Sequence, residues 1–163
     1  MRRVGLLMEL FFKKVGEERL NELVDLRAEF VKDLHPEYDD LTMEKVKKSS
    51  RNYFKELFDK ESYSGYLGFN ENNDIVCTAG TLIYFLPPLN SDSFRKIGHI
   101  LNFYVKPEYR KKGYGAKLMD FVKTEAKNDG INRLVLNATD MGYGLYLKSG
   151  FTEPKERYMT FDI

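Results

Sequence analysis

The sequence predicts an α/β (α+β) fold in which a mixed, mostly antiparallel central sheet is flanked by helices. Three observations lead to this fold class. Apolar residues first recur at the spacing of amphipathic helices and later change to the runs and alternation of strands. Two of these strand-like runs are joined by a short polar turn, which predicts an antiparallel hairpin. Strands alternate with helices in the second half of the chain, but the hairpin of the middle is antiparallel, which argues for a mixed sheet rather than an all-parallel one.

The N-terminal segment is expected to form one strand and two helices. The strand spans Met8 to Val15. A helix follows from Glu17 to Leu34, because its apolar residues recur at helical spacing, although Arg27 interrupts that stripe. His35-Pro36 ends this helix, since proline disfavours helical geometry in the residue before it. A second amphipathic helix is expected from Leu41 to Phe58.

The middle of the chain is expected to contain three strands. Gly65 to Phe69 and Ile75 to Leu86 form a hairpin around the polar turn at 72–74. After a loop, Ile97 to Val105 forms the next strand. Pro107 ends that strand, because proline has no amide proton for the hydrogen bonds of a sheet.

The C-terminal segment is expected to alternate between helices and strands. A helix spans Gly113 to Asn128 and is followed by a short strand from Leu134 to Leu136. A short helix spans Met141 to Lys148, and a last strand spans Arg157 to Phe161. This order predicts that the sheet contains a strand contributed by the C-terminus.

Length, charge and cysteine content exclude several classes of protein. With 163 residues, the chain is expected to form a single domain over residues 1–163. The formal net charge of +1 predicts no general attraction to nucleic acid or to an anionic membrane. Cys77 is the single cysteine, so no internal disulfide framework can form, and we expect a small buried residue there. His35 and His99 lie too far apart for a zinc-hydrolase motif, and no metal is expected.

The N-terminus resembles the start of a signal peptide only superficially. Met1-Arg2-Arg3 precedes an apolar run, but Glu9 interrupts that run and no small-residue cleavage site follows. No apolar run approaches the ~20 residues that span a bilayer. The sequence therefore predicts a soluble, cytoplasmic protein without membrane attachment.

Residues 105–116 carry the strongest chemical signal in the chain. A strand ends at Val105, a basic turn with Gly113 and Gly115 follows, and an amphipathic helix begins. The first amides of a helix have no partners within it and lie at the positive end of its dipole. Glycines there let a phosphate approach those amides closely. The turn also carries three basic residues, Arg110, Lys111 and Lys112. This pattern predicts an anion site suited to a pyrophosphate.

The turn by itself leaves other interpretations open. A Walker-type loop requires Gly-x-x-x-x-Gly-Lys-Ser/Thr, which the chain lacks. A dinucleotide-binding fingerprint requires a third glycine where the chain has Leu118. A purely structural glycine turn with solvated lysines, and a nucleotide-binding module that uses the same turn, remain alternatives.

Two spaced motifs resemble those of the GNAT (GCN5-related N-acetyltransferase) superfamily. Arg110-Lys-Lys-Gly113-Tyr-Gly115 is similar to the family signature Arg/Gln-x-x-Gly-x-Gly/Ala, which binds acetyl-CoA. Further along, residues 145–151 read Leu-Tyr-Leu-Lys-Ser-Gly-Phe and resemble the family element Leu-Tyr-x-x-x-Gly-Phe. The order of elements over residues 8–163 also fits. The resemblance implies a GNAT-like sheet that splays at the strand that holds the cofactor.

The resemblance also implies roles for individual residues. The strand at 103–105 should offer backbone groups to the pantetheine arm, and the turn at 111–116 should hold the pyrophosphate. Tyr146 falls where many family members protonate the departing CoA thiolate. Seven residues earlier, many members carry an asparagine, whereas this chain has Thr139, whose hydroxyl could still hydrogen-bond the cofactor. The implied cofactor-binding residues are Phe103, Tyr104, Val105, Arg110, Lys111, Lys112, Gly113, Tyr114, Gly115, Ala116 and Thr139.

His99 is the candidate general base. Alternation along a regular strand places it on the same face as Leu101, Phe103 and Val105. It also lies eleven residues before Arg110, the offset at which some family members carry a catalytic glutamate. Its ordinary pKa of ~6.5 suits proton acceptance near neutrality. A structural histidine, with ordered water as the base, is the alternative.

The resemblance implies an enzyme that moves an acetyl group from acetyl-CoA directly to a primary amine of a small molecule, peptide or protein. A non-catalytic acyl-CoA-binding or regulatory domain of the same fold is the alternative. The first two helices and nearby loops carry acidic residues that either attract a cationic amine or are simply solvated, namely Glu37, Asp39, Asp40 and Asp92. The sequence leaves the identity of the amine and a homodimer open.

Overall fold

The computed structural model describes residues 9–90, 95–155 and 157–163 and contains one five-stranded sheet. The strands lie in chain order, and the first four pair antiparallel with their neighbours, whereas β5 pairs parallel with β4. The strands are β1 Phe11–Val15, β2 Tyr63–Phe69, β3 Ile75–Leu86, β4 Arg95–Val105 and β5 Arg133–Val135. The predicted mixed, mostly antiparallel sheet is confirmed.

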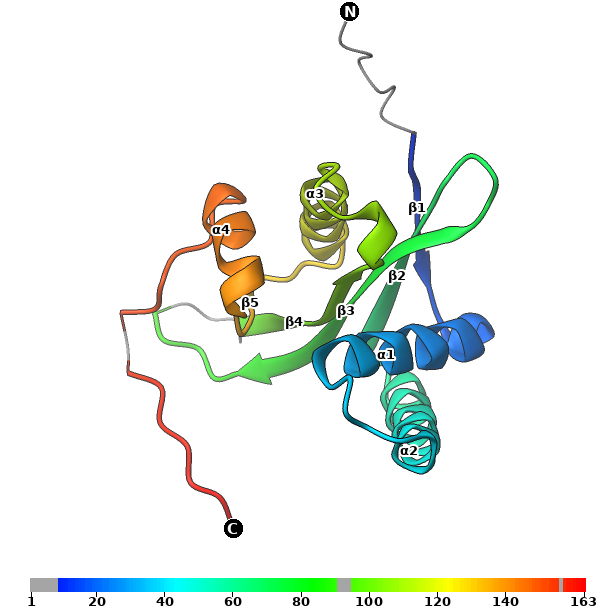
Figure 1. Cartoon of the computed structure of the whole chain (residues 1–163). Coiled ribbons are helices and arrows are strands. Elements are labelled where there is room, and N and C mark those ends of the chain that lie inside the picture. The colour runs from blue at the N-terminus through cyan, green and yellow to red at the C-terminus, as the bar shows by residue number, and fades with distance from the viewer. Residues whose placement is uncertain (1–8, 91–94, 156) are drawn as a thin grey trace, which may run out of the picture.

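Two pairs of helices cover the two faces of this sheet (Figure 1). Helices α1 and α2 lie on one face, and α3 and α4 lie on the other. Their bounds are α1 Leu20–Leu34, α2 Asp40–Asp59, α3 Tyr114–Asn128 and α4 Asp140–Lys148, with short 3-10 turns at Glu17–Arg19 and Pro107–Tyr109. Within the described ranges, no helix combines the length and the apolar character needed to cross a bilayer.

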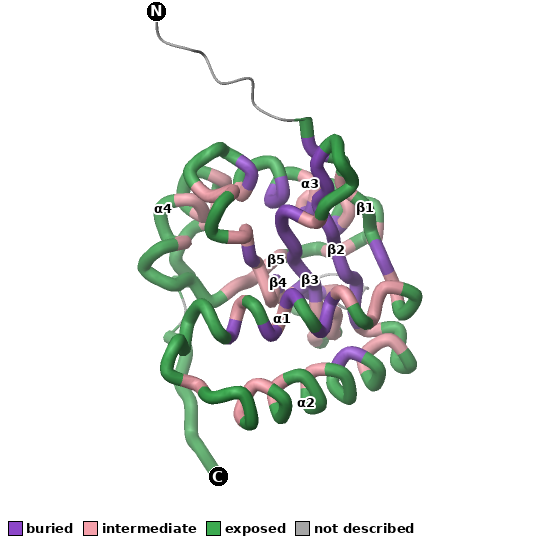
Figure 2. Tube along the Cα trace, turned by 45° about the vertical axis from the view of Figure 1, so that its right-hand side comes forward, coloured by how far each residue is buried: buried purple, intermediate pink, exposed green. Residues whose placement is uncertain are grey.

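Each face of the sheet has its own apolar core. On the α3/α4 side, Leu118, Met119 and Val122 of α3 pack against Tyr66 and Val76 of the sheet. On the α1/α2 side, the buried stripe of α1 and one residue of α2 pack on β2 through Leu23, Val24, Leu26, Phe54, Tyr63 and Leu67. Figure 2 shows the buried residues concentrated in the sheet and along the inner faces of the helices. Burial of these stripes fixes both helix pairs on the sheet.

A β-bulge in β4 changes which way its side chains point. Tyr104 pairs with Thr78 and Leu101 pairs with Gly80, so Asn102 and Phe103 together face one residue of β3. Asn102 has a φ of 54°, a left-handed conformation that asparagine tolerates better than most residues. A bulge of this kind shifts the alternation of the strand by one residue.

The shift corrects the prediction that His99 shares a face with Phe103 and Val105. Ile100, Phe103 and Val105 all pack into the core of the α3/α4 side, which a regular strand could not achieve. His99 precedes the bulge and is adjacent to Ile100, so it points to the opposite, α1/α2 side. The signal for the bulge, a single asparagine in an apolar strand, was too weak to predict it.

The predicted last strand, Arg157 to Phe161, is wrong. Residues 157–163 form no regular secondary structure, and the side chains of Tyr158, Met159 and Phe161 are 85–90% exposed. A strand requires a neighbouring strand for its backbone hydrogen bonds. In the described part of the chain, β5 is the edge strand of the sheet and no further strand pairs with it. The first strand begins at Phe11, and Met8 lies outside the described residues.

Candidate functional site

The sheet splays between β4 and β5. The two strands are paired only from Ile97 with Arg133 to His99 with Val135. Beyond His99, β4 continues to Val105 without a β5 partner in the described part of the chain. A cavity of about 840 Å³ lies at this opening, lined by parts of α1, α2, β4, the turn before α3, α3 and α4. The predicted splay is therefore confirmed, and β4 presents an unpaired backbone edge to the cavity.

The open segment of β4 sends its side chains into both sides of the cavity. Phe103 lies against Tyr146 of α4, with ring centroids 5.8 Å apart. Tyr104 lies against Phe30 of α1, with centroids 5.4 Å apart. The backbone between them is an edge on which an extended ligand arm could bind as an additional strand does. The structure thus places the predicted residues 103–105 at the wall of the cavity.

The basic turn after β4 ends at the N-terminus of α3. Lys111 and Gly113 have positive φ values of 60° and 78°, and α3 begins at Tyr114. Backbone of this type turns successive amides toward one point, where they can bind an anion. The first turn of α3 contains no acidic residue that would neutralise the positive end of the helix. Gly113 and Gly115 line the cavity, and a Cβ at Gly115 would lie 3.1 Å from Cδ2 of Leu145.

Two of the three basic side chains in this turn stabilise it through hydrogen bonds to backbone carbonyls. Arg110 donates from Nε to the carbonyl of Val105 at 2.9 Å, and its guanidinium forms an ion pair with Asp33 of α1 at 2.5 Å. Lys112 donates to the carbonyl of Glu108 at 2.9 Å. Lys111 lines the cavity and has no ion-pair partner among the described residues, so its charge is available to a ligand.

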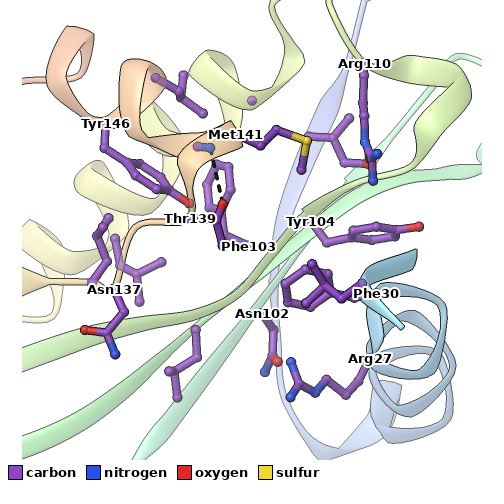
Figure 3. Close-up of a pocket in the computed structure, with 18 of the residues that line it drawn as sticks. Arg27, Phe30, Asn102, Phe103, Tyr104, Arg110, Asn137, Thr139, Met141 and Tyr146 are labelled. Carbon is purple, nitrogen blue, oxygen red and sulfur yellow. Dashed lines mark hydrogen bonds between the residues drawn. The ribbon is translucent and has the colours of Figure 1, made fainter. Parts of the chain in front are cut away.

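Helix α4 carries Tyr146 over the open strand. The Tyr146 ring packs between Phe103 and Phe151, and burial raises the pKa of its phenol above the ordinary value. The phenol therefore stays protonated at neutral pH and can act as a proton donor. Thr139 is the N-cap of α4, where its hydroxyl oxygen accepts a hydrogen bond from the amide of Gly142 at 3.3 Å (Figure 3). Its own hydroxyl proton can still be donated to a ligand in the cavity.

His99 lines the cavity from the α1/α2 side, away from Phe103 and Tyr146. Its Nε2 atom is buried, and none of the described residues offers it a hydrogen bond. Burial lowers the pKa of the imidazole below its ordinary value. The ring is therefore neutral at neutral pH, which is the form that a general base requires.

The remaining sequence candidates lie outside this cavity. Cys77 is buried in β3, and burial raises the pKa of its thiol to about 12, so it is a core residue as expected. Glu37 hydrogen-bonds His35, and Asp39 caps α2 through the amide of Thr42. Asp40 does not line the cavity, and Asp92 lies outside the described residues. None of the described acidic candidates faces the cavity.

Sequence reasoning missed part of the α1/α2 side of the cavity. Arg27 of α1 and Asn102 of β4 both line it, and Figure 3 shows the guanidinium directed toward the Asn102 amide. Asn102 in turn donates to the hydroxyl of Tyr63 at 3.3 Å. The interruption of the apolar stripe of α1 by Arg27 was the signal available in the sequence. Tyr53 and two serines of α2 complete this side.

The sequence matches the acetyltransferase (GNAT) family over residues 20–151. Among solved structures, the chain is similar to a GCN5-related N-acetyltransferase from Ralstonia eutropha JMP134, with 26% identity, a TM-score of 0.74, and coverage of 94% of this chain and 99% of that chain. It is also similar to a predicted acetyltransferase with acetyl-CoA from Clostridium acetobutylicum, with 24% identity, a TM-score of 0.77, and coverage of 94% and 96%.

A third similar structure is the glucosamine-6-phosphate N-acetyltransferase from Arabidopsis thaliana, with 18% identity, a TM-score of 0.66, and coverage of 94% of this chain and 98% of that chain. No curated protein gives a significant match. The family match extends over most of the chain, from α1 to the end of the segment that carries Tyr146. The chain therefore belongs to the acetyltransferase (GNAT) family.

Proposed function

We propose that this protein is an N-acetyltransferase that uses acetyl-CoA and transfers the acetyl group directly to a primary amine. One observation carries the proposal: the unpaired edge of β4 runs from the middle of the cavity to the N-terminus of α3, with the Tyr146 ring packed on the same strand. An acyl-CoA has the matching parts in the same order: a reactive thioester, an extended amide-containing arm and a pyrophosphate.

The residues present fit this cosubstrate. The amides at the start of α3 and the Lys111 charge would bind the pyrophosphate, and the backbone of β4 at 103–105 would hydrogen-bond the arm. Arg110 and Lys112 would keep the turn in its binding conformation through the contacts they make with Val105 and Glu108. The Thr139 hydroxyl would donate a hydrogen bond to the arm. The similar structure that contains acetyl-CoA supports this assignment.

Direct transfer needs a proton acceptor and a proton donor. The amine must be neutral to attack the thioester carbonyl carbon, so it gives a proton to water or to His99. As the new C–N bond forms and the C–S bond breaks, the sulfur leaves as a thiolate, which takes the phenolic proton of Tyr146. The nitrogen loses its second proton to water as the amide forms, and water returns a proton to the Tyr146 phenolate. The buried, protonated phenol is suited to this step, and the neutral imidazole of His99 is suited to the first.

The amine acceptor is supported by the family and by the names of similar proteins, among them the Arabidopsis enzyme named for glucosamine 6-phosphate. A non-catalytic acyl-CoA-binding domain would have the same turn and strand edge. It would not need a protonated phenol beside the open strand, so the position of Tyr146 favours the enzyme.

Release of free CoA from acetyl-CoA in the presence of a panel of primary amines tests this function. We expect CoA to stabilise the protein against heat, because a ligand that binds only the native state raises the free energy of unfolding. We also expect amine-dependent release of CoA above the hydrolysis background. CoA binding without turnover for any amine would support the non-catalytic alternative, and no thermal shift at millimolar CoA would contradict both.

A further inference from the structure

The α1/α2 side of the cavity, where the amine acceptor would bind under the proposed function, is polar, but the described residues contribute no acidic group to it. No aspartate or glutamate is among the described residues that line the cavity. The polar side chains on this side are Arg27, Ser49, Ser50, Tyr53, His99 and Asn102. A site for a polycationic amine needs carboxylates to bind the additional positive charges. These lining residues instead offer a cation and several hydrogen-bond donors.

Arg27 is the charged group at the centre of this side. It is half-buried, its guanidinium lies 5.4 Å from the centroid of the Phe30 ring, and it points toward the Asn102 amide (Figure 3). Among the described residues no carboxylate forms an ion pair with it. Burial lowers the pKa of this guanidinium, which shows that its charge has lost solvation. An arginine keeps its charge under such conditions, and an anionic ligand would offset part of the cost of its burial.

Arg110, a second arginine that lines the same cavity, differs from Arg27 because a carboxylate of the protein neutralises it. Arg110 is also partly buried, stacks over an aromatic ring, and lies 5.5 Å from the centroid of Tyr104. Unlike Arg27, it is neutralised by Asp33 at 2.5 Å and bonded to a backbone carbonyl. Within the described part of the chain, Arg110 therefore has an anionic partner and Arg27 has none.

Neighbouring groups of Arg27 can donate to an anion but cannot replace one. Burial raises the pKa values of the Tyr53 and Tyr63 phenols, so both stay neutral at neutral pH. The hydroxyl groups of Tyr53 and of the serines of α2 line the cavity and can donate hydrogen bonds there, whereas Tyr63 is buried behind Asn102 and does not line it. Tyr63 is held by the Asn102 amide, so the bulge of β4 is part of the same polar cluster.

We propose that the amine acceptor carries an anionic group, a carboxylate or a phosphate, and that Arg27 binds this group in the α1/α2 side of the cavity. The proposal rests on the proposed function and adds the substrate class to it. A planar guanidinium matches the paired oxygens of both groups. The anionic group would hold the acceptor beneath α1 and α2, with its amine toward the open segment of β4.

Anion binding can be measured without turnover. With the α3 site saturated by CoA, three small primary amines are compared by thermal shift and calorimetry: O-phosphoethanolamine, β-alanine and ethanolamine. We expect the phosphate or the carboxylate amine to bind at least 10-fold more tightly than ethanolamine, and the two anionic probes distinguish the two chemistries. In Arg27→Gln that preference should disappear. Equal binding of all three amines, or no effect of Arg27→Gln on the preference, would overturn the proposal.

Two variants serve as controls. Arg51→Gln removes an exposed arginine of α2 that does not line the cavity, so it should leave the preference unchanged. Arg27→Lys retains the charge without the planar fork and should retain part of the preference. If Arg27→Gln is poorly folded, Arg27→Lys decides the proposal alone. A reduced or absent preference in a folded Arg27→Lys protein would support the guanidinium as the binding group, and a preference equal to that of the wild-type protein would contradict it.

Turnover with the same amines separates this proposal from the proposed function. If CoA is released as efficiently with ethanolamine as with the anionic amines, the anionic site is wrong and the acetyltransferase stands. If the anionic amines bind through Arg27 but no amine releases CoA, the anionic site stands and the acetyltransferase is wrong. If CoA itself fails to bind, the proposed function has failed, and the variants are compared without CoA, where loss of anion preference in Arg27→Gln still supports the site.

Discussion

The two sides of the cavity are built from different kinds of chemical group. On the α3/α4 side, the groups assigned to the cosubstrate are mostly backbone: the amides at the start of α3 and the open edge of β4. On the α1/α2 side, the groups available to an acceptor are side chains, mainly those of Arg27, His99 and Asn102. Backbone groups are suited to bind a cosubstrate that a whole family shares, because they are present whatever the side chains are. Side chains, in contrast, can change with the acceptor. A sequence motif therefore identifies the first side and leaves the second open.

The largest effect should come from Tyr146, the side chain of the α3/α4 side that we propose as the proton donor. Tyr146→Phe should lower kcat by roughly 10- to 1,000-fold, because the thiolate would leave without a proton donor. The affinity for CoA should change little, because the ring and its packing on Phe103 remain. Steady-state kinetics with direct CoA titration measures both. Tyr143→Phe is the matched control, since that phenol is exposed and bonds Glu153 instead; equal rates for both variants would reassign Tyr146 to packing.

The backbone character of the α3/α4 side can be tested at Gly115. A valine there would place its Cβ near Leu145 and its methyl groups where the pyrophosphate approaches the amides. We expect about a 100-fold loss of CoA affinity, roughly 2.8 kcal/mol, with the fold retained by circular dichroism. Gly144→Ala is the control, since a Cβ at Gly144 meets no other atom within 4 Å. Unchanged CoA affinity in Gly115→Val would show that the turn is only structural.

The α1/α2 side should control the pH dependence. If His99 is the base, kcat/KM should fall as the pH drops through the pKa of His99, which burial sets below its ordinary value of ~6.5. Because the folded state disfavours the charged imidazole, the free energy of unfolding should also decrease as the pH falls below that ordinary value. His99→Gln should remove the acidic limb of the rate profile and leave CoA binding intact. His35→Gln, at an exposed histidine, is the control; a limb that persists in His99→Gln assigns the base to water.

The smallest effect is expected where the two sides are joined. Asp33 of α1 pairs with Arg110 of the basic turn, and both side chains are 27% exposed. Asp33→Asn should lower the free energy of unfolding by about 1 kcal/mol or less, because partly solvated ion pairs contribute little. CoA affinity should fall by only about 3-fold, or 0.7 kcal/mol, since the Arg110 bond to Val105 remains. Asp25→Asn breaks an exposed pair with Lys47 and is the control. A loss of CoA affinity as large as that of Gly115→Val would give Arg110 a direct role in binding.

The sequence predicted the parts of this molecule that depend on local patterns. The helix stripes, the hairpin and the basic turn before α3 follow from periodicity and from glycine positions, and each forms as predicted. The last strand failed because alternation at 157–161 cannot reveal whether a neighbouring strand is available. The position of His99 failed because one left-handed residue, Asn102, reverses the alternation of β4. Arg27 was visible as a break in an apolar stripe, but only the three-dimensional structure shows that no carboxylate of residues 9–90, 95–155 and 157–163 pairs with it.

The bulge of β4 has a geometric consequence for how the two reactants would meet. In a regular strand, residues two apart share a face, so 99, 101, 103 and 105 would all serve one compartment. The additional residue at 102 divides this series, so that His99 and Leu101 border one compartment and Phe103 and Val105 border the other. A single strand thus forms a wall of both, and the change of direction occurs within one or two peptide units. If the same residues formed a regular strand without the bulge, Phe103 would turn to the side of His99 and Tyr146 would lose its aromatic support, so the conformation at Asn102 is as constrained as the composition of the strand.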